Sequence, residues 1–241
     1  MKRRFAGLSD PGLVRSVNQD DYYIDPEGRF FIIADGMGGH AGGQEASHIA
    51  TEVVKEDLEE YWESPRPSTK LLNEALERAN LAIVADQQSN PERGDMGTTA
   101  VVMIFRQGES WCAHVGDSRL YRLRGSQLEQ ITEDHTWVSR ATKAGDLTLE
   151  QARVHPWRHV LSQCLGRKDL QHIEIQTLEV KPGDRLLLCS DGLTEELSDE
   201  VIGSYLITNS SSEQIAKDLV EEAKKEGGSD NITVVVVEET E

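Results

Sequence analysis

The sequence predicts an α+β fold in which antiparallel β-sheets are covered by amphipathic helices. Short apolar, β-branched runs follow one another between residues 101 and 123 with no helical stretch between them. This pattern favours antiparallel meanders over βαβ units. The strand-like run Phe30–Ala34 is followed instead by a long segment in which apolar residues recur with a period of 3.6 residues, which indicates a helix packed on a sheet.

The charge balance limits the classes of partner. The 241 residues include 43 acidic and 25 basic side chains, for a formal net charge of −18. A protein that binds nucleic acid or an anionic membrane needs a basic surface to displace counterions, so neither is expected as a partner. The apolar stretch after Met1–Arg4 is broken by Gly7 and Pro11, and it fits neither a signal peptide nor a membrane span.

Three cysteines occur without paired spacing, at Cys112, Cys164 and Cys189. Two of them lie inside strand-like runs, so we expect reduced, mostly buried residues in a cytoplasmic protein. No repeat and no long Ser/Gly linker divides the chain. We therefore expect residues 1–241 to form a single domain, and we also expect a monomer.

The first predicted element pair is a hairpin. The run that starts at Asp20 leads into Tyr22–Ile24, a Pro-Glu-Gly turn follows, and Phe30–Ala34 is the partner strand, which we expect to stop at Asp35. Whether the carboxylates of Asp20 and Asp35 meet depends on the register of the two strands, which the sequence leaves open.

A glycine-rich loop and two helices come next. Glycines at 36, 38, 39, 42 and 43 allow the backbone to approach a ligand closely and leave carbonyl oxygens accessible as metal ligands. The period of 3.6 residues then predicts one helix over Ala41–Trp62 and a second whose inner face runs from Leu72 to Ile83. An Asp-Gly pair after a strand is more often only a turn, but a turn alone does not need so many glycines.

Three more strands are expected at Val101–Phe105, Trp111–Val115 and Leu120–Leu123. Residues 135–170 have a broken, mostly helical pattern and are expected to form an inserted flap. This segment holds six basic and three acidic residues, a net charge of +3, so the remainder of the chain carries −21. A basic segment in an acidic protein is a candidate surface for contacts with an anionic ligand.

The C-terminal part alternates strands and helices. We expect strands at Ile173–Ile175, Asp184–Cys189 and Ile232–Val237, and helices at Thr194–Leu206 and around residues 215–223. The strand that ends at Cys189 is followed, like the strand at 30–34, by an Asp-Gly pair. The last strand is preceded by an Asp-Asn pair.

Four aspartates therefore stand where predicted strands begin or end, namely Asp20, Asp35, Asp191 and Asp230. If the sheets bring them together, four carboxylates could not all stay ionised without compensation. Hard divalent cations such as Mg²⁺ and Mn²⁺ supply it, because they prefer carboxylate, carbonyl and water oxygens. Arg15 is the nearby basic residue, and a guanidinium suits a phosphate anion.

Six short motifs in order resemble the signatures of the type-2C metal-dependent serine/threonine protein phosphatases, in their compact bacterial form. The motifs are Arg15–Asp21, Asp35–His40, Met96–Thr99, Gly116–Arg119, Ser190–Gly192 and Asp230–Asn231. Each is weak alone, but together they span nearly the whole chain. The resemblance implies a four-layer α-β-β-α sandwich with two central antiparallel sheets, and a site for two Mg²⁺ or Mn²⁺ ions at one end of the sheets.

The resemblance also implies metal ligands at particular positions. Asp35 corresponds to the carboxylate that bridges both ions, and the Gly36 carbonyl is a further ligand. Asp20 is expected to hold the second ion, and Asp191 with Asp230 the first. Such a pair of ions activates a water molecule for in-line attack on phosphorus, so no side-chain nucleophile is needed.

Other roles are expected for five residues around the metals. The resemblance implies that Asp117 binds a third, weaker ion, that Arg15 binds the phosphate, and that His40 is the general acid. The alternative for His40 is a histidine that is only hydrogen-bonded within its loop. From the charge of the flap we expect His159 and Arg167 to hold the phosphorylated segment, the alternative being that they only tie the flap down.

The expected function is hydrolysis of phosphoserine and phosphothreonine in a phosphorylated protein, as part of signalling. Two alternatives remain open at this point. A two-metal hydrolase of small phosphate esters or diesters would use the same carboxylates, and a non-catalytic metal-binding interaction module would keep the ligands without the chemistry.

Overall fold

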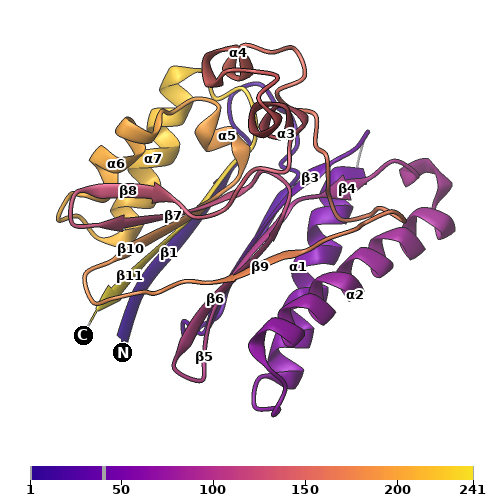
Figure 1. Ribbon diagram of the computed structural model, residues 1–241, viewed down its shortest axis with the longest axis horizontal. Helices are drawn as coiled ribbons and strands as arrows, with labels where there is room; N and C mark the ends of the chain where they lie inside the picture. The colour runs from indigo at the N-terminus through magenta and orange to yellow at the C-terminus, as the bar shows by residue number, and fades with distance from the viewer. Residues whose placement is uncertain (1, 40–41, 241) are drawn as a thin grey trace.

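The computed structural model describes residues 2–39 and 42–240 and shows two antiparallel sheets packed face to face between two layers of helices (Figure 1). The first sheet has the order β1-β11-β10-β7-β8. Its strands are β1 (Lys2–Asp10), β11 (Ile232–Thr240), β10 (Arg185–Cys189), β7 (Arg119–Arg124) and β8 (Gln127–Gln130). The expected α-β-β-α sandwich is confirmed.

The second sheet has the order β2-β3-β5-β6-β9, and a short strand, β4 (Gly97–Thr98), pairs with β3 beside it. The other strands are β2 (Asp20–Ile24), β3 (Phe30–Met37), β5 (Ala100–Arg106), β6 (Glu109–Val115) and β9 (Glu174–Thr177). The β2–β3 hairpin has the register that places Asp20 directly opposite Asp35. The question that the sequence left open is thereby answered.

The helices cover the outer faces of the sheets. Figure 1 shows α1 (Gly42–Tyr61) and α2 (Ser68–Ser89) outside the second sheet, and α6 (Asp199–Leu206) and α7 (Ser212–Glu226) outside the first. A short 3₁₀ turn, Pro91–Arg93, follows α2. In the part of the chain that the structure describes, no helix has both the length and the apolar character needed to cross a membrane.

The core has three layers because the central strands are buried on both faces. Alternate side chains of a strand point to opposite faces, so Phe30 and Ile32 of β3 pack against α1 and α2 while Phe31 and Ile33 pack between the sheets. Residues 234–237 of β11 divide in the same way between the inter-sheet layer and the layer under α7. Continuous apolar runs, rather than alternating ones, follow from this double burial.

Two predicted boundaries are wrong, and one strand was not predicted. Strand β3 does not stop at Asp35 but continues to Met37, because Gly36 and Met37 pair with Thr98 and Gly97 of β4. The N-terminal strand β1 was not expected, since its polar and glycine residues hid its pairing with β11 over nine positions.

The segment Thr194–Leu206 is not one helix. Asp191 begins the short helix α5 (Asp191–Thr194), and Ser198 then caps a separate α6, its hydroxyl accepting a hydrogen bond from the backbone N–H of Val201. A serine at this place starts a new helix rather than continuing the old one.

The flap contains α3 (Trp137–Ala144) and α4 (Leu149–Arg153) and lies above one end of the sheets (Figure 1). A single β-bridge between Leu165 and Thr98 of β4 connects the flap to the sheet. A second bridge, between Thr136 and Leu161, joins two parts of the flap. All three cysteines are buried and free, as expected.

Candidate functional site

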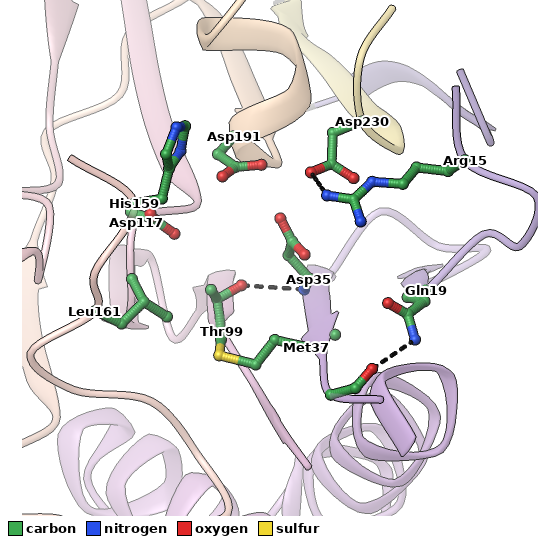
Figure 2. A pocket seen from close by; sticks show the side chains of 12 residues that line it. Arg15, Gln19, Asp35, Met37, Thr99, Asp117, His159, Leu161, Asp191 and Asp230 are labelled. Carbon is green, nitrogen blue, oxygen red and sulfur yellow. Dashed lines mark hydrogen bonds and ion pairs between the residues drawn. The ribbon is translucent and has the colours of Figure 1, made fainter. Parts of the chain in front are cut away.

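A cavity of about 230 Å³ lies at the end of the two sheets where the flap begins. Figure 2 shows the carboxylates of Asp35, Asp191 and Asp230 facing one another across it. Asp35 comes from β3, Asp191 from the first turn of α5, and Asp230 from the residue pair before β11. Asp117, between β6 and β7, lines the same cavity. Carboxylates from four places in the chain therefore meet in this cavity, although Asp35 and Asp230 are 195 residues apart in the sequence.

Two threonines fix the backbone of Asp35. The hydroxyl of Thr98 donates a hydrogen bond to the Asp35 carbonyl at 2.9 Å, and the Asp35 N–H donates to the hydroxyl of Thr99 at 3.0 Å. The Thr99 hydroxyl is also 2.6 Å from that of Ser118, next to Asp117. Thr99 thus connects the central carboxylate to the Asp117 loop. Thr99 belongs to the Met96–Thr99 motif, but its sequence context predicted no role for it.

Asp20 lies behind the cavity rather than in its wall. Its Oδ2 accepts hydrogen bonds from the hydroxyls of Ser190 at 2.7 Å and Thr233 at 2.6 Å, and its buried Oδ1 has no hydrogen-bond partner among the described residues. Gln19, the residue before it, lines the cavity instead. The assignment of Asp20 as a direct ligand came from the motif alone, and Gln19, although it lies in the same motif, was not predicted to line the site.

The carboxylates destabilise one another's charge. Burial, followed by the nearby aspartates, raises the pKa of Asp20 to about 7 and that of Asp191 to about 6. Burial is also the main cause that raises the pKa of Asp35 and of Asp117 well above the usual range, with Asp191 contributing to both.

These features fit a divalent-cation site. An orphaned buried oxygen on Asp20 and several mutually repelling carboxylates need a positive partner. All the donors are oxygens, the type that Mg²⁺ and Mn²⁺ prefer. Gly36, which is buried, belongs to the cavity wall as well.

Arg15 stands at the rim and points toward Asp230 (Figure 2), with Nη2 2.7 Å from Asp230 Oδ2. The guanidinium is half exposed. The hydrogen bond that Arg15 donates to Asp230 is the largest cause that raises the pKa of Arg15, so the side chain is a permanent cation beside the cavity.

The two flap residues are placed differently. His159 lines the cavity, and its Nδ1 is 3.2 Å from Oε1 of Glu195. Arg167 does not line the cavity; its guanidinium pairs with Asp169, and its backbone N–H donates to the side chain of Asn80. His40 lies outside the described residues.

Comparison with known proteins gives consistent matches. The family model described as Protein phosphatase 2C matches residues 14–233. The serine/threonine protein phosphatase PstP of Mycobacterium tuberculosis is 37% identical over 238 residues, 98% of this chain. The protein phosphatase PhpP of Streptococcus pneumoniae is 38% identical over 240 residues, 95% of this chain and 95% of its own. The chain spans 45% of the length of the M. tuberculosis relative.

A solved structure supports the same comparison. The catalytic domain of the serine/threonine protein phosphatase PstP in complex with two manganese ions superposes with a TM-score of 0.85 at 35% identity, covering 99% of each chain. The motifs of the sequence, the sandwich and the carboxylate cavity therefore all agree with this group of proteins.

Proposed function

The chain belongs to the protein phosphatase 2C family, and we propose that it is a metal-dependent phosphatase that hydrolyses phosphoserine and phosphothreonine in bacterial signalling proteins. The observation that carries the proposal is the convergence of Asp35, Asp191 and Asp230 in one cavity with Arg15 at its rim. Clustered oxygens attract cations, and the guanidinium attracts the phosphate.

We propose that two Mg²⁺ or Mn²⁺ ions bind to this cluster. Asp35 and the carbonyl of Gly36 would be the central ligands, and Asp191 with Asp230 would hold the first ion. Asp20 remains in the proposed set on the second side because its buried Oδ1 needs a cation or a bound water. When bound, such a pair of ions lowers the pKa of a water molecule and neutralises charge on the phosphoryl group.

Asp117 is proposed as the ligand of a third, weaker ion, since it lines the cavity on the side of the flap. Its neighbours Thr99 and Ser118 tie it to the backbone of Asp35. The protein contributes geometry here, because hydroxyls and backbone groups hold the carboxylates in place before any ion arrives.

The substrate phosphate is proposed to bind Arg15, which then exchanges its carboxylate partner for a phosphoryl oxygen. His159 is proposed to contact the phosphorylated segment, because it lines the cavity from the flap. Arg167 would reach that segment only outside the cavity, after leaving Asp169. His40 is kept as a proposed general acid on the motif alone.

We also propose a cytoplasmic location and a monomeric state. Three free, buried cysteines suit a reducing compartment. The net charge of −18 opposes binding to nucleic acid or to anionic membranes. The physiological partner is therefore a phosphorylated protein that approaches the flap.

The test is release of phosphate from a phosphothreonine peptide by the purified protein with Mn²⁺ or Mg²⁺. Asp35→Ala should abolish turnover, EDTA should do the same reversibly, and Asp146→Ala, which removes an exposed carboxylate of the flap, should leave the rate unchanged. Faster hydrolysis of a phosphodiester would favour a small-ester hydrolase. Metal binding by a folded protein without any turnover would favour the non-catalytic module.

A further inference from the structure

Three residues from distant parts of the chain meet beneath the flap, next to the cavity but outside its wall. They are His114 on β6, His135 at the start of the flap and Glu174 on β9, and one potential ligand atom of each lies within 4.8 Å of the others. The two imidazole rings stack with centroids 4.6 Å apart. The proposed chemistry assigns no role to any of them.

One nitrogen of each ring is hydrogen-bonded to the backbone, while the buried Nδ1 of His114 has no partner among the described residues. Nε2 of His114 is 2.8 Å from the carbonyl oxygen of Glu133, and Nδ1 of His135 accepts a hydrogen bond from the N–H of Gly116 at 3.2 Å. A backbone N–H can only donate, so Nδ1 of His135 is unprotonated and its ring proton is on Nε2. Nε2 is 3.4 Å from Oε2 of Glu174, so this proton faces the Glu174 carboxylate. The arrangement therefore indicates a hydrogen-bonded chain rather than a metal site.

His135 holds Gly116 at both of its peptide groups. The ring accepts from the Gly116 N–H, and the backbone N–H of His135 donates to the Gly116 carbonyl at 2.9 Å. The conformation that is held is one that favours glycine, with φ at +106°, and a Cβ there would be 2.6 Å from the Cβ of Thr99. Gly116 is thus fixed between Thr99 on one side and His135 on the other.

The fixed residue immediately precedes Asp117, whose carboxylate lines the cavity. We infer that His135, oriented by Glu174, is a positioning residue that fixes the Gly116 backbone and so aims Asp117 into the metal cavity. The inference rests on the proposed role of Asp117 as a ligand. It connects the base of the flap to the weaker of the proposed metal positions.

Two substitutions distinguish the roles of the two ring nitrogens of His135. In His135→Asn the side-chain oxygen takes the place of Nδ1 and can still accept from the Gly116 N–H. In His135→Gln the amide takes the place of Nε2, so the contact with Glu174 is kept and the acceptor for Gly116 is lost. His172→Gln is the matched control, because His172 is exposed and lies outside both the cluster and the metal cavity.

The experiment is a Mn²⁺ titration of the chelator-treated protein, followed by electron paramagnetic resonance of the free ion, which requires no catalysis. Asp117→Ala should remove the weakest class of sites. His135→Gln should weaken that same class about tenfold or more and leave the tighter classes unchanged, as expected for an outer-shell partner. His135→Asn should stay within about threefold of the unsubstituted protein, and His172→Gln should match it.

Three results would overturn the inference: an unchanged weak class in His135→Gln, equal weakening in the Asn and Gln variants, or parallel weakening of every class with a lower melting temperature. The last would show a purely structural role. A protein that gives the expected titrations but does not hydrolyse phosphopeptides would contradict the proposed function and leave the inference standing.

Discussion

Arg15 and Asp230 form an ion pair at the rim of the cavity, and this pair gives the first prediction. Arg15→Ala should lower kcat/KM for a phosphopeptide by about 10- to 100-fold, because a hydrogen bond to a charged group contributes roughly 1.5–3 kcal/mol. The affinity of the Arg15→Ala protein for Mn²⁺ should not fall, since the arginine no longer competes with the ion for the Asp230 carboxylate. Steady-state kinetics and a metal titration check both parts.

Arg15→Lys is the matched control for that prediction. A lysine keeps the charge but cannot make two parallel hydrogen bonds to a phosphoryl group. The kcat/KM of Arg15→Lys should therefore lie between that of the unsubstituted protein and that of Arg15→Ala. Weaker Mn²⁺ binding in Arg15→Ala would contradict the account, because it would make the arginine part of the metal site.

Thr99 gives a second prediction, because its buried hydroxyl accepts the N–H of Asp35 and pairs with Ser118. Thr99→Val keeps the shape and leaves these groups unsatisfied, which should lower the free energy of unfolding by about 1–3 kcal/mol per buried group. Turnover should fall as well, since Asp35 loses its backbone support.

Thr99→Ser keeps the hydroxyl and should retain most of the activity and of the stability, apart from the loss of one methyl group. Urea unfolding and kcat measured on the same samples provide the check. A Val variant with unchanged kcat would mean that Asp35 needs no such support.

At the scale of single residues, the sequence identified the aspartates of the site but not the residues that hold them in place. Asp35, Asp191 and Asp230 could be singled out because each stands beside a glycine or an asparagine at a strand end. His135 and Glu174 could not, because they have no local pattern and meet only through the pairing of β6 with β9 and the return of the chain at the flap.

Between elements, the close approach of β3 to α1 gives a third prediction. A Cβ on Gly36 would lie 2.0 Å from the backbone oxygen of Gly43 and 2.5 Å from that of Gln19. Gly36→Ala must therefore push α1 away, which should cost about 1–3 kcal/mol of stability or more. Metal affinity should also fall, because Gly36 lies in the cavity wall.

Gly203→Ala is the control for this substitution. Gly203 lies within α6, and the nearest atom to its added Cβ would be 3.7 Å away, an ordinary contact. Alanine in a helix interior should raise stability by about 0.5–1 kcal/mol. Chemical denaturation distinguishes the two, and a neutral Gly36→Ala would contradict the geometry.

Strand and helix cores were predictable and their ends were not. The Phe30–Ala34 run and the period after it identify β3 and α1, because double burial and one-sided burial leave clear patterns. The end of β3 depends on pairing with β4, 60 residues later, and β1 depends on β11 at the opposite end of the chain. Non-local pairing leaves no local trace.

For the whole molecule, the carboxylate cluster predicts an unusual dependence of stability on pH. In the metal-free protein the pKa of Asp20 is raised, chiefly by burial, from 3.8 to about 7. A carboxyl with a raised pKa in the folded state stabilises the fold fully below 3.8, and this contribution is lost as the pH rises through about 7. Asp191 acts in the same direction with a pKa of about 6.

The metal-free protein should therefore melt at a higher temperature at about pH 5 than at about pH 8. Saturating Mg²⁺ should raise the melting temperature most at the higher pH, because cations bind the ionised carboxylates. Calorimetry with and without EDTA provides the measurement. Equal metal effects at both pH values would contradict this electrostatic account.

The layered architecture was predictable only through the resemblance. Strand succession indicated antiparallel sheets, but two sheets packed face to face and the site at one end came from the family motifs. The charge of the flap was visible in the sequence, yet of its two expected contact residues the structure brings His159 to the cavity and leaves Arg167 paired with Asp169. The fold, rather than the charge count, determines which flap side chain reaches the site.

The most direct measurement is anomalous diffraction from crystals grown with Mn²⁺. We expect two peaks about 3.5–4 Å apart in the cavity, both in contact with the carboxylate of Asp35, and one of them also in contact with Asp191 and Asp230. Manganese at other carboxylates, or a cavity that takes up no ion at full activity, would contradict the central claim that these aspartates form the metal site.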